Sequence, residues 1–188
     1  YPAGKIRIPH DAKSRAGGVM YTDYALGRFF AEASKQPWFG NTIFLITADH
    51  CASSAGRTEI PLEKYHIPAV ILAPGLVEPC EVDGIVSQID LMPTLFSLLN
   101  MSYDSRFYGR SVFDPDYTNR AFIATYQDLG YLEGDTFTIL SPVRRVEQYR
   151  VVPTEKNPHN LEPAATTDEE QVNRAIAYYQ TSCKWHKR

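Results

Sequence analysis

The sequence has few cysteines, and their spacing excludes the small protein classes that cysteines define. Cys51, Cys80 and Cys183 are the three cysteines in 188 residues, with no CxxC pair and no cluster typical of a zinc knuckle. The sequence leaves open whether Cys80 and Cys183 form a disulfide. Cys51 has no Gly-Cys elbow and no separate orienting acid, so we interpret it as a small residue in a turn rather than as a nucleophile.

Strong charge of one sign and long apolar runs are also missing. The formal net charge is −3, which attracts neither nucleic-acid phosphates nor an anionic lipid surface. No apolar stretch approaches the roughly 18 residues that a membrane-spanning helix needs. We find no signal-peptide pattern, and the chain begins with Tyr1 instead of Met, so we expect a piece cut from a longer protein.

The first half of the chain has the pattern of an α/β protein. Apolar residues recur at helical spacing from Val19 through Leu26, which predicts an amphipathic helix over residues 15–35 with one buried stripe. Residues 42–47 and 67–73 are short apolar runs, typical of strands covered on both faces. Because no helical stripe lies between them, we predict that the second strand runs antiparallel and begins where the first ends.

The second half begins with a helix and continues as a β meander. Residues 90–99 form a helix that starts at Asp90, its N-cap or first-turn acid. Gly130 is interpreted as a turn residue, the stretch 153–166 as a loop, and residues 167–183 as a final capped helix. Short β-like segments recur at 121–126, 137–140 and 145–152.

A carboxylate and an imidazole follow the first predicted strand. Asp49 and His50 stand at its carboxyl end, where open α/β sheets place their ligands. Carboxylate oxygen and neutral imidazole nitrogen together suit a divalent ion such as manganese, magnesium or zinc. The alternative is that Asp49 caps the following turn and His50 is a partly exposed loop residue.

The residues after this pair add groups that bind anions. The loop 52–57 (ASSAGR) offers backbone N–H groups and hydroxyls beside Arg57, a setting that suits a phosphate or sulfate oxygen. Lys64 is a second cation, and His66 is a donor or a metal ligand. Solvated surface charges and a strand-edge histidine are the alternatives. The other histidines lie in Pro-rich or terminal contexts and are interpreted as ordinary surface residues: His10, His159 and His186.

Taken in order, the motifs resemble a known family. They are the segments 21–27 (YTDYALG), 41–42 (NT), 49–50 (DH), 67–68 (IP), 74–75 (PG), 90–94 (DLMPT) and 109–111 (GRS). This succession resembles the sulfatase-type members of the alkaline phosphatase superfamily. The Asp-His pair, where many sulfatases carry Asp-Asn, and the segment 63–68 (EKYHIP) resemble the lipoteichoic acid synthase and phosphoglycerol transferase branch.

The resemblance implies a fold and a division of the chain. The fold is an α/β protein, a three-layer α/β/α sandwich, of which residues 1–188 are the carboxy-terminal portion. Residues 15–112 carry the core motifs, and residues 113–188, which match loosely, carry antiparallel strands and a terminal helix. This chain is therefore expected to hold only part of the active site.

The same resemblance implies site residues. Asp49 and His50 are metal ligands, together with an acid and a nucleophilic Thr expected before Tyr1. The cofactor is one divalent ion, manganese or magnesium first, with zinc or calcium as alternatives. Arg57, which stands near a substrate-binding Lys of sulfatases, is assigned to the substrate. The resemblance also assigns His66 to the substrate, with a second ion as the alternative. Lys64 is assigned to the substrate on its charge, as the second cation of this segment.

The implied activity is transfer of a phosphoglycerol or phosphoethanolamine-type group to cell-envelope glycans or lipids, through a covalent intermediate on the upstream Thr. A sulfatase or phosphodiesterase hydrolase is one alternative, and a non-catalytic binding domain is another. Expected partners are an anionic ester substrate and a glycan or lipid acceptor, with no nucleic acid. The parent is expected outside the cytoplasm and anchored by amino-terminal membrane helices, and this segment alone is expected to be inactive.

Overall fold

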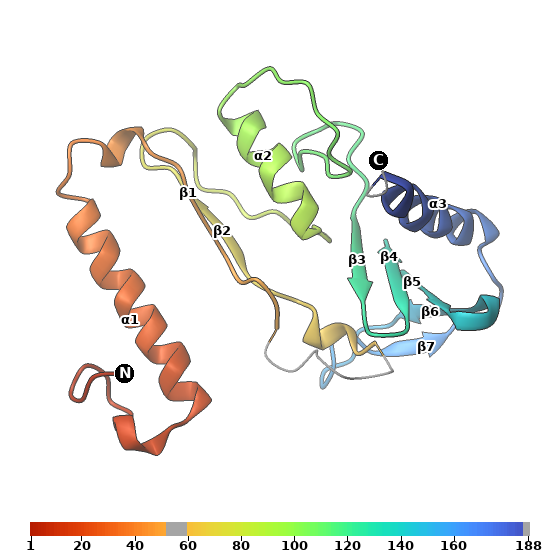
Figure 1. Cartoon of the computed structure of the whole chain (residues 1–188), viewed down its shortest axis with the longest axis horizontal. Helices are drawn as coiled ribbons and strands as arrows, with labels where there is room; N and C mark the ends of the chain where they lie inside the picture. The colour runs from red at the N-terminus through yellow and green to blue at the C-terminus, as the bar shows by residue number, and fades with distance from the viewer. Residues whose placement is uncertain (52–59, 186–188) are drawn as a thin grey trace. The chain divides into compact units, whose positions relative to one another are not determined.

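The computed structural model describes residues 1–51 and 60–185, and the chain divides into two compact units. Unit 1 comprises Tyr1–Ile46 and Ile71–Pro79, and unit 2 comprises Thr47–Val70 and Cys80–Arg188. The elements, with η for a 3-10 helix, are η1 (His10–Ala12), α1 (Arg15–Ala33), η2 (Phe39–Asn41), β1 (Phe44–Thr47), η3 (Leu62–Lys64), β2 (Ala69–Leu72), η4 (Gln88–Asp90), α2 (Leu91–Leu98), β3 (Arg120–Ala124), β4 (Leu129–Glu133), β5 (Thr136–Ser141), η5 (Pro142–Arg144), β6 (Arg145–Val151), β7 (Leu161–Pro163) and α3 (Glu169–Trp185) (Figure 1).

Unit 1 is a capped helix joined to an aromatic cluster. The Ser14 side chain caps α1 by accepting the backbone N–H of Gly17 at 3.0 Å. Phe44 of β1 is the centre of the cluster, and its ring contacts four aromatic rings from the end of α1 and the following turn. These four are Phe29, Phe30, Trp38 and Phe39, with ring centroids 5.2–6.3 Å from that of Phe44.

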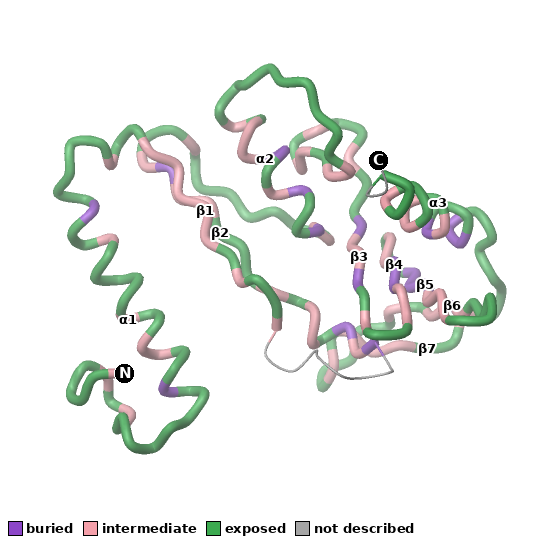
Figure 2. The backbone as a smooth tube through the Cα atoms, in the orientation of Figure 1, coloured by how far each residue is buried: buried purple, intermediate pink, exposed green. Residues whose placement is uncertain are grey.

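The predicted buried stripe of this helix is correct only near its end. Ala33 is 3% exposed, but Val19 is 66% exposed and Leu26 37%. Figure 2 shows α1 exposed over most of its length. The reason is that the apolar partners described in unit 1 gather around Phe44, beside the last turns of the helix.

The strands β1 and β2 form a two-stranded sheet. Ala48, directly after β1, donates its N–H to the carbonyl of Pro68, directly before β2, at 3.4 Å. The end of one strand therefore lies beside the start of the other, which confirms the predicted antiparallel return (Figure 1). The prediction that both faces are covered is wrong for the described residues, because this sheet has two strands and leaves Val70 55% exposed.

Unit 2 contains a five-stranded antiparallel sheet in the order β3-β4-β5-β6-β7, the predicted meander. Two of its strands were not predicted. Gly130, interpreted as a turn residue, pairs with Ile139 inside β4, where a Cβ would press on the ring of Phe137. Pro163 lies in β7 opposite Tyr149, at the sheet edge, where a missing N–H is tolerated.

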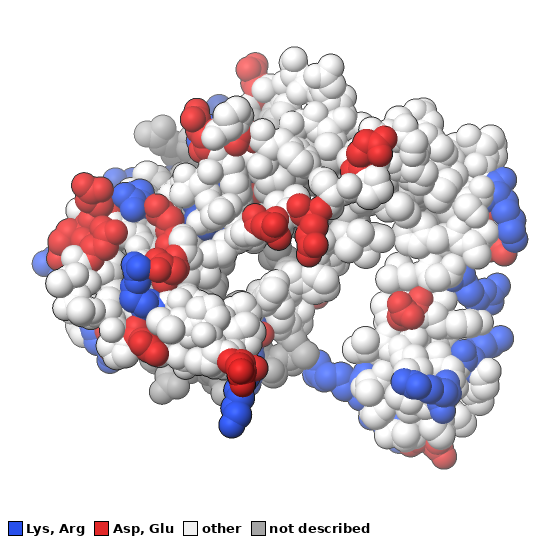
Figure 3. Space-filling view, turned by 180° about the vertical axis from the view of Figure 1, so that it is seen from behind, with Lys and Arg blue, Asp and Glu red and all other residues white. Residues whose placement is uncertain are grey.

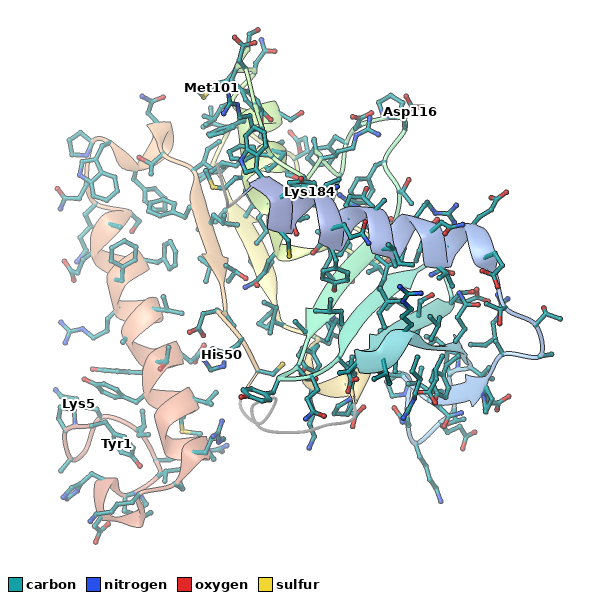
Figure 4. All side chains as sticks on the ribbon, turned by 45° about the vertical axis from the view of Figure 1, so that its right-hand side comes forward. Tyr1, Lys5, His50, Met101, Asp116 and Lys184 are labelled. Carbon is teal, nitrogen blue, oxygen red and sulfur yellow. The ribbon has the colours of Figure 1, made fainter. Side chains whose placement is uncertain are left out.

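Helix α3 packs on this sheet along β4 and β5 (Figure 4). The Tyr179 hydroxyl donates to the carbonyl of Gly130 at 2.7 Å and lies 3.0 Å from that of Ile123. Asp168 caps the helix by accepting the N–H of Gln171 at 3.0 Å, as the sequence predicted for this end. The buried apolar cluster of the sheet consists of Ile60, Leu62, Ile123 and Phe137.

Candidate metal centre

Asp49 and His50 lie side by side just beyond the end of β1. The Oδ2 atom of Asp49 is 3.3 Å from the Nε2 atom of His50. The side chain of Asp49 is 87% exposed and that of His50 is 72% exposed, and Figure 4 labels His50 at this end of the strand. The pair is therefore accessible to an ion without further rearrangement of the described residues.

The backbone determines which nitrogen of His50 is available. Nδ1 lies 2.8 Å from the carbonyl oxygen of Cys51. A carbonyl can only accept, so Nδ1 carries the proton and, in the neutral imidazole, Nε2 keeps its lone pair. Asp49 is held as well, because its Oδ1 accepts the backbone N–H of His50 at 2.9 Å. This is the pattern by which outer hydrogen bonds orient metal-binding histidines.

The pair fits a divalent cation. A carboxylate oxygen and an imidazole lone pair are both electron-rich, and they face each other at 3.3 Å. Two ligands bound at about 2.1 Å to one ion lie roughly 3.0–3.4 Å apart, which agrees with this separation. Among residues 1–51 and 60–185, no group of three or more His, Cys, Asp or Glu side chains is placed to hold an ion. Asp49 and His50 are thus a pair of candidate ligands within the described residues.

Of the other predicted site residues, the structure describes Lys64 and His66. The thiol of Cys51 donates to the carbonyl of His66 at 3.2 Å, which brings the backbone of His66 beside the residue that follows His50. Lys64 is the half-buried last residue of η3. Arg57 and the loop 52–57 fall within residues 52–59, outside the described part of the chain.

His159, which we interpreted from the sequence as an ordinary surface residue, lies beside His66. Its ring lies edge-on to that of His66, with centroids 5.4 Å apart. The backbone N–H of the half-buried His159 donates to Oδ1 of Asn157 at 2.9 Å. Because 93 residues separate His66 from His159 by number, no local pattern in the sequence signals this contact.

The cysteines form no disulfide in the structure. The bridge between Cys80 and Cys183 that the sequence left open is not formed, and both residues are exposed. The Cys51 contact with His66 agrees with its interpretation as a residue of the turn.

Unit 2 also contains a buried ion pair, formed by Asp90 and Arg120. Asp90 is 0% exposed and contacts the guanidinium of Arg120, which is 2% exposed. Its carboxylate also accepts the N–H groups of Ser87 and Arg110 and the hydroxyl of Tyr117. Burial, followed by the negative charge of Asp90, raises the pKa of Tyr117. Burial alone lowers the pKa of Arg120, but the Asp90 carboxylate contributes to a net upward shift. The predicted role of Asp90 at a helix start is confirmed by a reciprocal capping box with Ser87.

Comparison with solved structures identifies the fold. The crystal structure of a protein in the alkaline phosphatase superfamily from Vibrio parahaemolyticus matches this chain with a TM-score of 0.83 and 32% sequence identity. The match covers 97% of this chain and 46% of that protein, so the chain spans about half of its length. The chain thus has an alkaline phosphatase superfamily fold, which confirms the predicted fold class.

The family follows from the sequence match. The family model described as Sulfatase matches residues 3–101, just over half of the 188 residues. The chain belongs to the sulfatase family. Members of this superfamily are usually catalytic and metal-dependent. Within residues 1–51 and 60–185, no helix has the length and apolar character needed to cross a membrane.

Proposed function

We propose that this chain is part of the catalytic domain of a metal-dependent enzyme that acts on phospho- or sulfo-esters. The observation that carries the proposal is the 3.3 Å approach of Asp49 Oδ2 to His50 Nε2, with Nδ1 of His50 committed to a backbone carbonyl. Membership of the sulfatase family and the alkaline phosphatase superfamily fold support the same class of reaction.

Each residue then has a separate role. Asp49 and His50 hold the divalent ion, and the carbonyl of Cys51 retains the Nδ1 proton so that Nε2 stays available. When bound, the ion neutralises developing negative charge on the ester group and activates the nucleophile. We assign His66 and Lys64, with Arg57, to the anionic group of the substrate. The resemblance assigns the nucleophile and the remaining ligand to an upstream Thr and an upstream acid.

The finer proposal is transfer of a phosphoglycerol or phosphoethanolamine-type group to an envelope glycan or lipid. It is supported by the Asp49-His50 pair and by the segment 63–68 (EKYHIP), which resemble the transferase branch. We further propose that the parent acts outside the cytoplasm and is anchored in the membrane by helices ahead of this domain. A nucleic-acid partner is not proposed, because acidic and basic side chains both occupy the face in Figure 3 and the net charge is −3.

Ion binding is tested by titrating the full-length protein with Mn²⁺ and measuring free Mn²⁺ by electron paramagnetic resonance. Asp49→Ala and His50→Ala each remove a ligand, so we expect at least about a tenfold loss of affinity. Asp83→Ala, an exposed acid in unit 2, is the matched control and should leave the affinity unchanged. Full affinity in Asp49→Ala would remove this residue from the ligand set and with it the proposal.

The reaction is tested by offering the full-length protein a glycerophospholipid together with a glycan acceptor and, separately, an aryl sulfate. Transfer moves the phospho-alcohol group from the lipid to an acceptor hydroxyl and releases diacylglycerol. A phosphodiesterase instead releases diacylglycerol and the free phospho-alcohol, and a sulfatase releases inorganic sulfate. We expect the first result, and sulfate release alone would replace the transferase proposal with the hydrolase. The 188-residue chain by itself should turn over neither substrate.

A further inference from the structure

The side chain of Gln88 is attached to the backbone that carries the candidate ligands. Its Nε2 donates to the carbonyl of Ala48 at 3.1 Å and to the carbonyl of Asp49 at 2.9 Å. Both hydrogens of the carboxamide are thereby used, and both acceptors belong to consecutive residues. Carbonyl oxygens can only accept, so the orientation of the amide is determined by its partners.

These two carbonyls lie where β1 has ended. The N–H of Ala48 is bonded to Pro68, so one edge of the segment follows β2. Gln88 supplies the donors for the next two carbonyls, those of Ala48 and Asp49. Together the two hydrogen bonds fix the peptide planes on either side of the Asp49 Cα atom.

Gln88 is itself held by the buried ion pair. It is the first residue of η4, and it directly follows Ser87, which is 6% exposed and shares the capping box with Asp90. Asp90 in turn contacts Arg120 with neither side chain more than 2% exposed. A buried hydrogen-bonded network therefore ends at Ser87, the residue next to Gln88.

We propose that Gln88 is a positioning residue that presets the separation of Asp49 Oδ2 and His50 Nε2 for the ion. The proposal rests on the proposed function, because it assigns Gln88 to the same ion site. Gln88 contacts the backbone of the ligands and not the ion. Its removal leaves both ligands in the chain but lets the Asp49-His50 backbone turn, so the ion binds more weakly.

The test uses the full-length protein with Gln88→Met, which keeps the length of the side chain and removes both donors. Outer partners of metal ligands typically contribute 10- to 100-fold to metal affinity, so we expect a loss of about tenfold or more for Mn²⁺. At saturating Mn²⁺, kcat should fall while KM changes less than about twofold. Gln180→Met, an exposed glutamine on α3, is the matched control and should preserve both quantities.

A second variant separates positioning from charge. Gln88→Glu has nearly the same shape but presents an oxygen to the two carbonyls, so positioning predicts weaker Mn²⁺ binding although a negative charge is added. Tighter binding in Gln88→Glu would overturn the proposal, because Gln88 would then act by its charge near the ion. Thermal unfolding of each variant in the absence of metal shows whether the protein is folded.

Asp49→Ala distinguishes the two levels of inference. If Asp49→Ala weakens Mn²⁺ binding and both Gln88 variants retain full affinity, the role of Gln88 is refuted and the ion site stands. If Asp49→Ala itself retains full affinity, the proposed function fails first. If Gln88→Met does not fold, Gln88→Glu alone decides, by the direction in which the Mn²⁺ affinity moves.

Discussion

The carboxylate of Asp90 and the guanidinium of Arg120 meet through two nitrogen–oxygen contacts of 3.2 Å each, with 0% and 2% of their side chains exposed. Around the guanidinium lie the rings of Tyr117, Phe122 and Tyr178, each 5.6–5.8 Å from it. The pair joins the start of α2 to the start of β3. It therefore connects the segment that carries Gln88 to the five-stranded sheet.

Asp90→Asn should destabilise the protein by about 3 kcal/mol or more, because it leaves the Arg120 charge buried without its counter-ion. Chemical denaturation at pH 7 measures the change. Asp114→Asn is the control, since Asp114 pairs with Arg110 where the two side chains are 31% and 48% exposed. Solvent screens that surface pair, so its loss should destabilise the protein far less than the loss of the buried pair. Equal effects of the two substitutions would contradict a structural role for the buried pair.

Gly109→Ala should also be costly, because an added Cβ would overlap the carbonyl oxygen of Ile89. The backbone must then move between Tyr108, whose carbonyl accepts from Arg120, and Arg110, whose N–H binds Asp90. We expect a loss of about 1–3 kcal/mol in the free energy of unfolding.

The matched control for Gly109 is Gly27→Ala in α1, where nothing lies within 4 Å of the new Cβ. Because alanine favours the helix over glycine, this variant should gain about 0.5–1 kcal/mol. If Gly109→Ala were as stable as the original protein, the close approach of this loop to Ile89 would be refuted.

Because the pKa of Tyr179 is raised in the folded protein, we expect a loss of stability at alkaline pH. Burial raises its pKa to about 12, and its neutral hydroxyl donates to the carbonyl of Gly130. In the unfolded chain the phenol ionises near its ordinary pKa of about 10, so the unfolded state gains from deprotonation first. The contribution is thus fully present below pH ~10 and is lost as the pH rises toward 12, on the order of 2 kcal/mol in total.

Denaturation midpoints at pH 9 and pH 11 measure this dependence. Tyr179→Phe should be less stable at pH 9, by about 1 kcal/mol for the lost hydrogen bond. It should also lose less stability than the original protein between the two pH values. An unchanged slope in Tyr179→Phe would show that other groups carry the alkaline transition.

The candidate ion site predicts a gain in stability on metal binding. Mn²⁺ at about 100 times its dissociation constant should stabilise the full-length protein by about 2.7 kcal/mol, since it binds the native state. A chelator should reverse the gain, and Asp49→Ala should abolish it at the same Mn²⁺ concentration. A gain that persists in Asp49→Ala would place the stabilising ion elsewhere. Thermal unfolding with and without Mn²⁺ is the measurement.

Local chemistry determined which parts of the fold the sequence predicted. The helix start at Asp90 and the capped start of the final helix were predicted because a cap depends on neighbours a few residues away. The strand β7 was missed because it depends on pairing with β6, not on its own residues, which include Pro163. The exposed stripe of α1 was mispredicted because a hydrophobic pattern does not show which partner is present.

The same distinction applies to the site. Asp49 and His50 are adjacent, so the sequence identified them together. Gln88 contacts Asp49, and His159 contacts His66, across long stretches of sequence. Neither residue belongs to a recognisable motif, so these contacts are visible only in the folded structure. The loop with Arg57 stays a prediction.

Two hydrogen bonds, from Cys51 to His66 and from Ala48 to Pro68, join the segment that follows β1 to the segment that precedes β2. The backbone on both sides of Asp49 and His50 is thus coupled to the residues that lead into β2. A shift of Pro68 or His66 would therefore be transmitted to both candidate ligands at once.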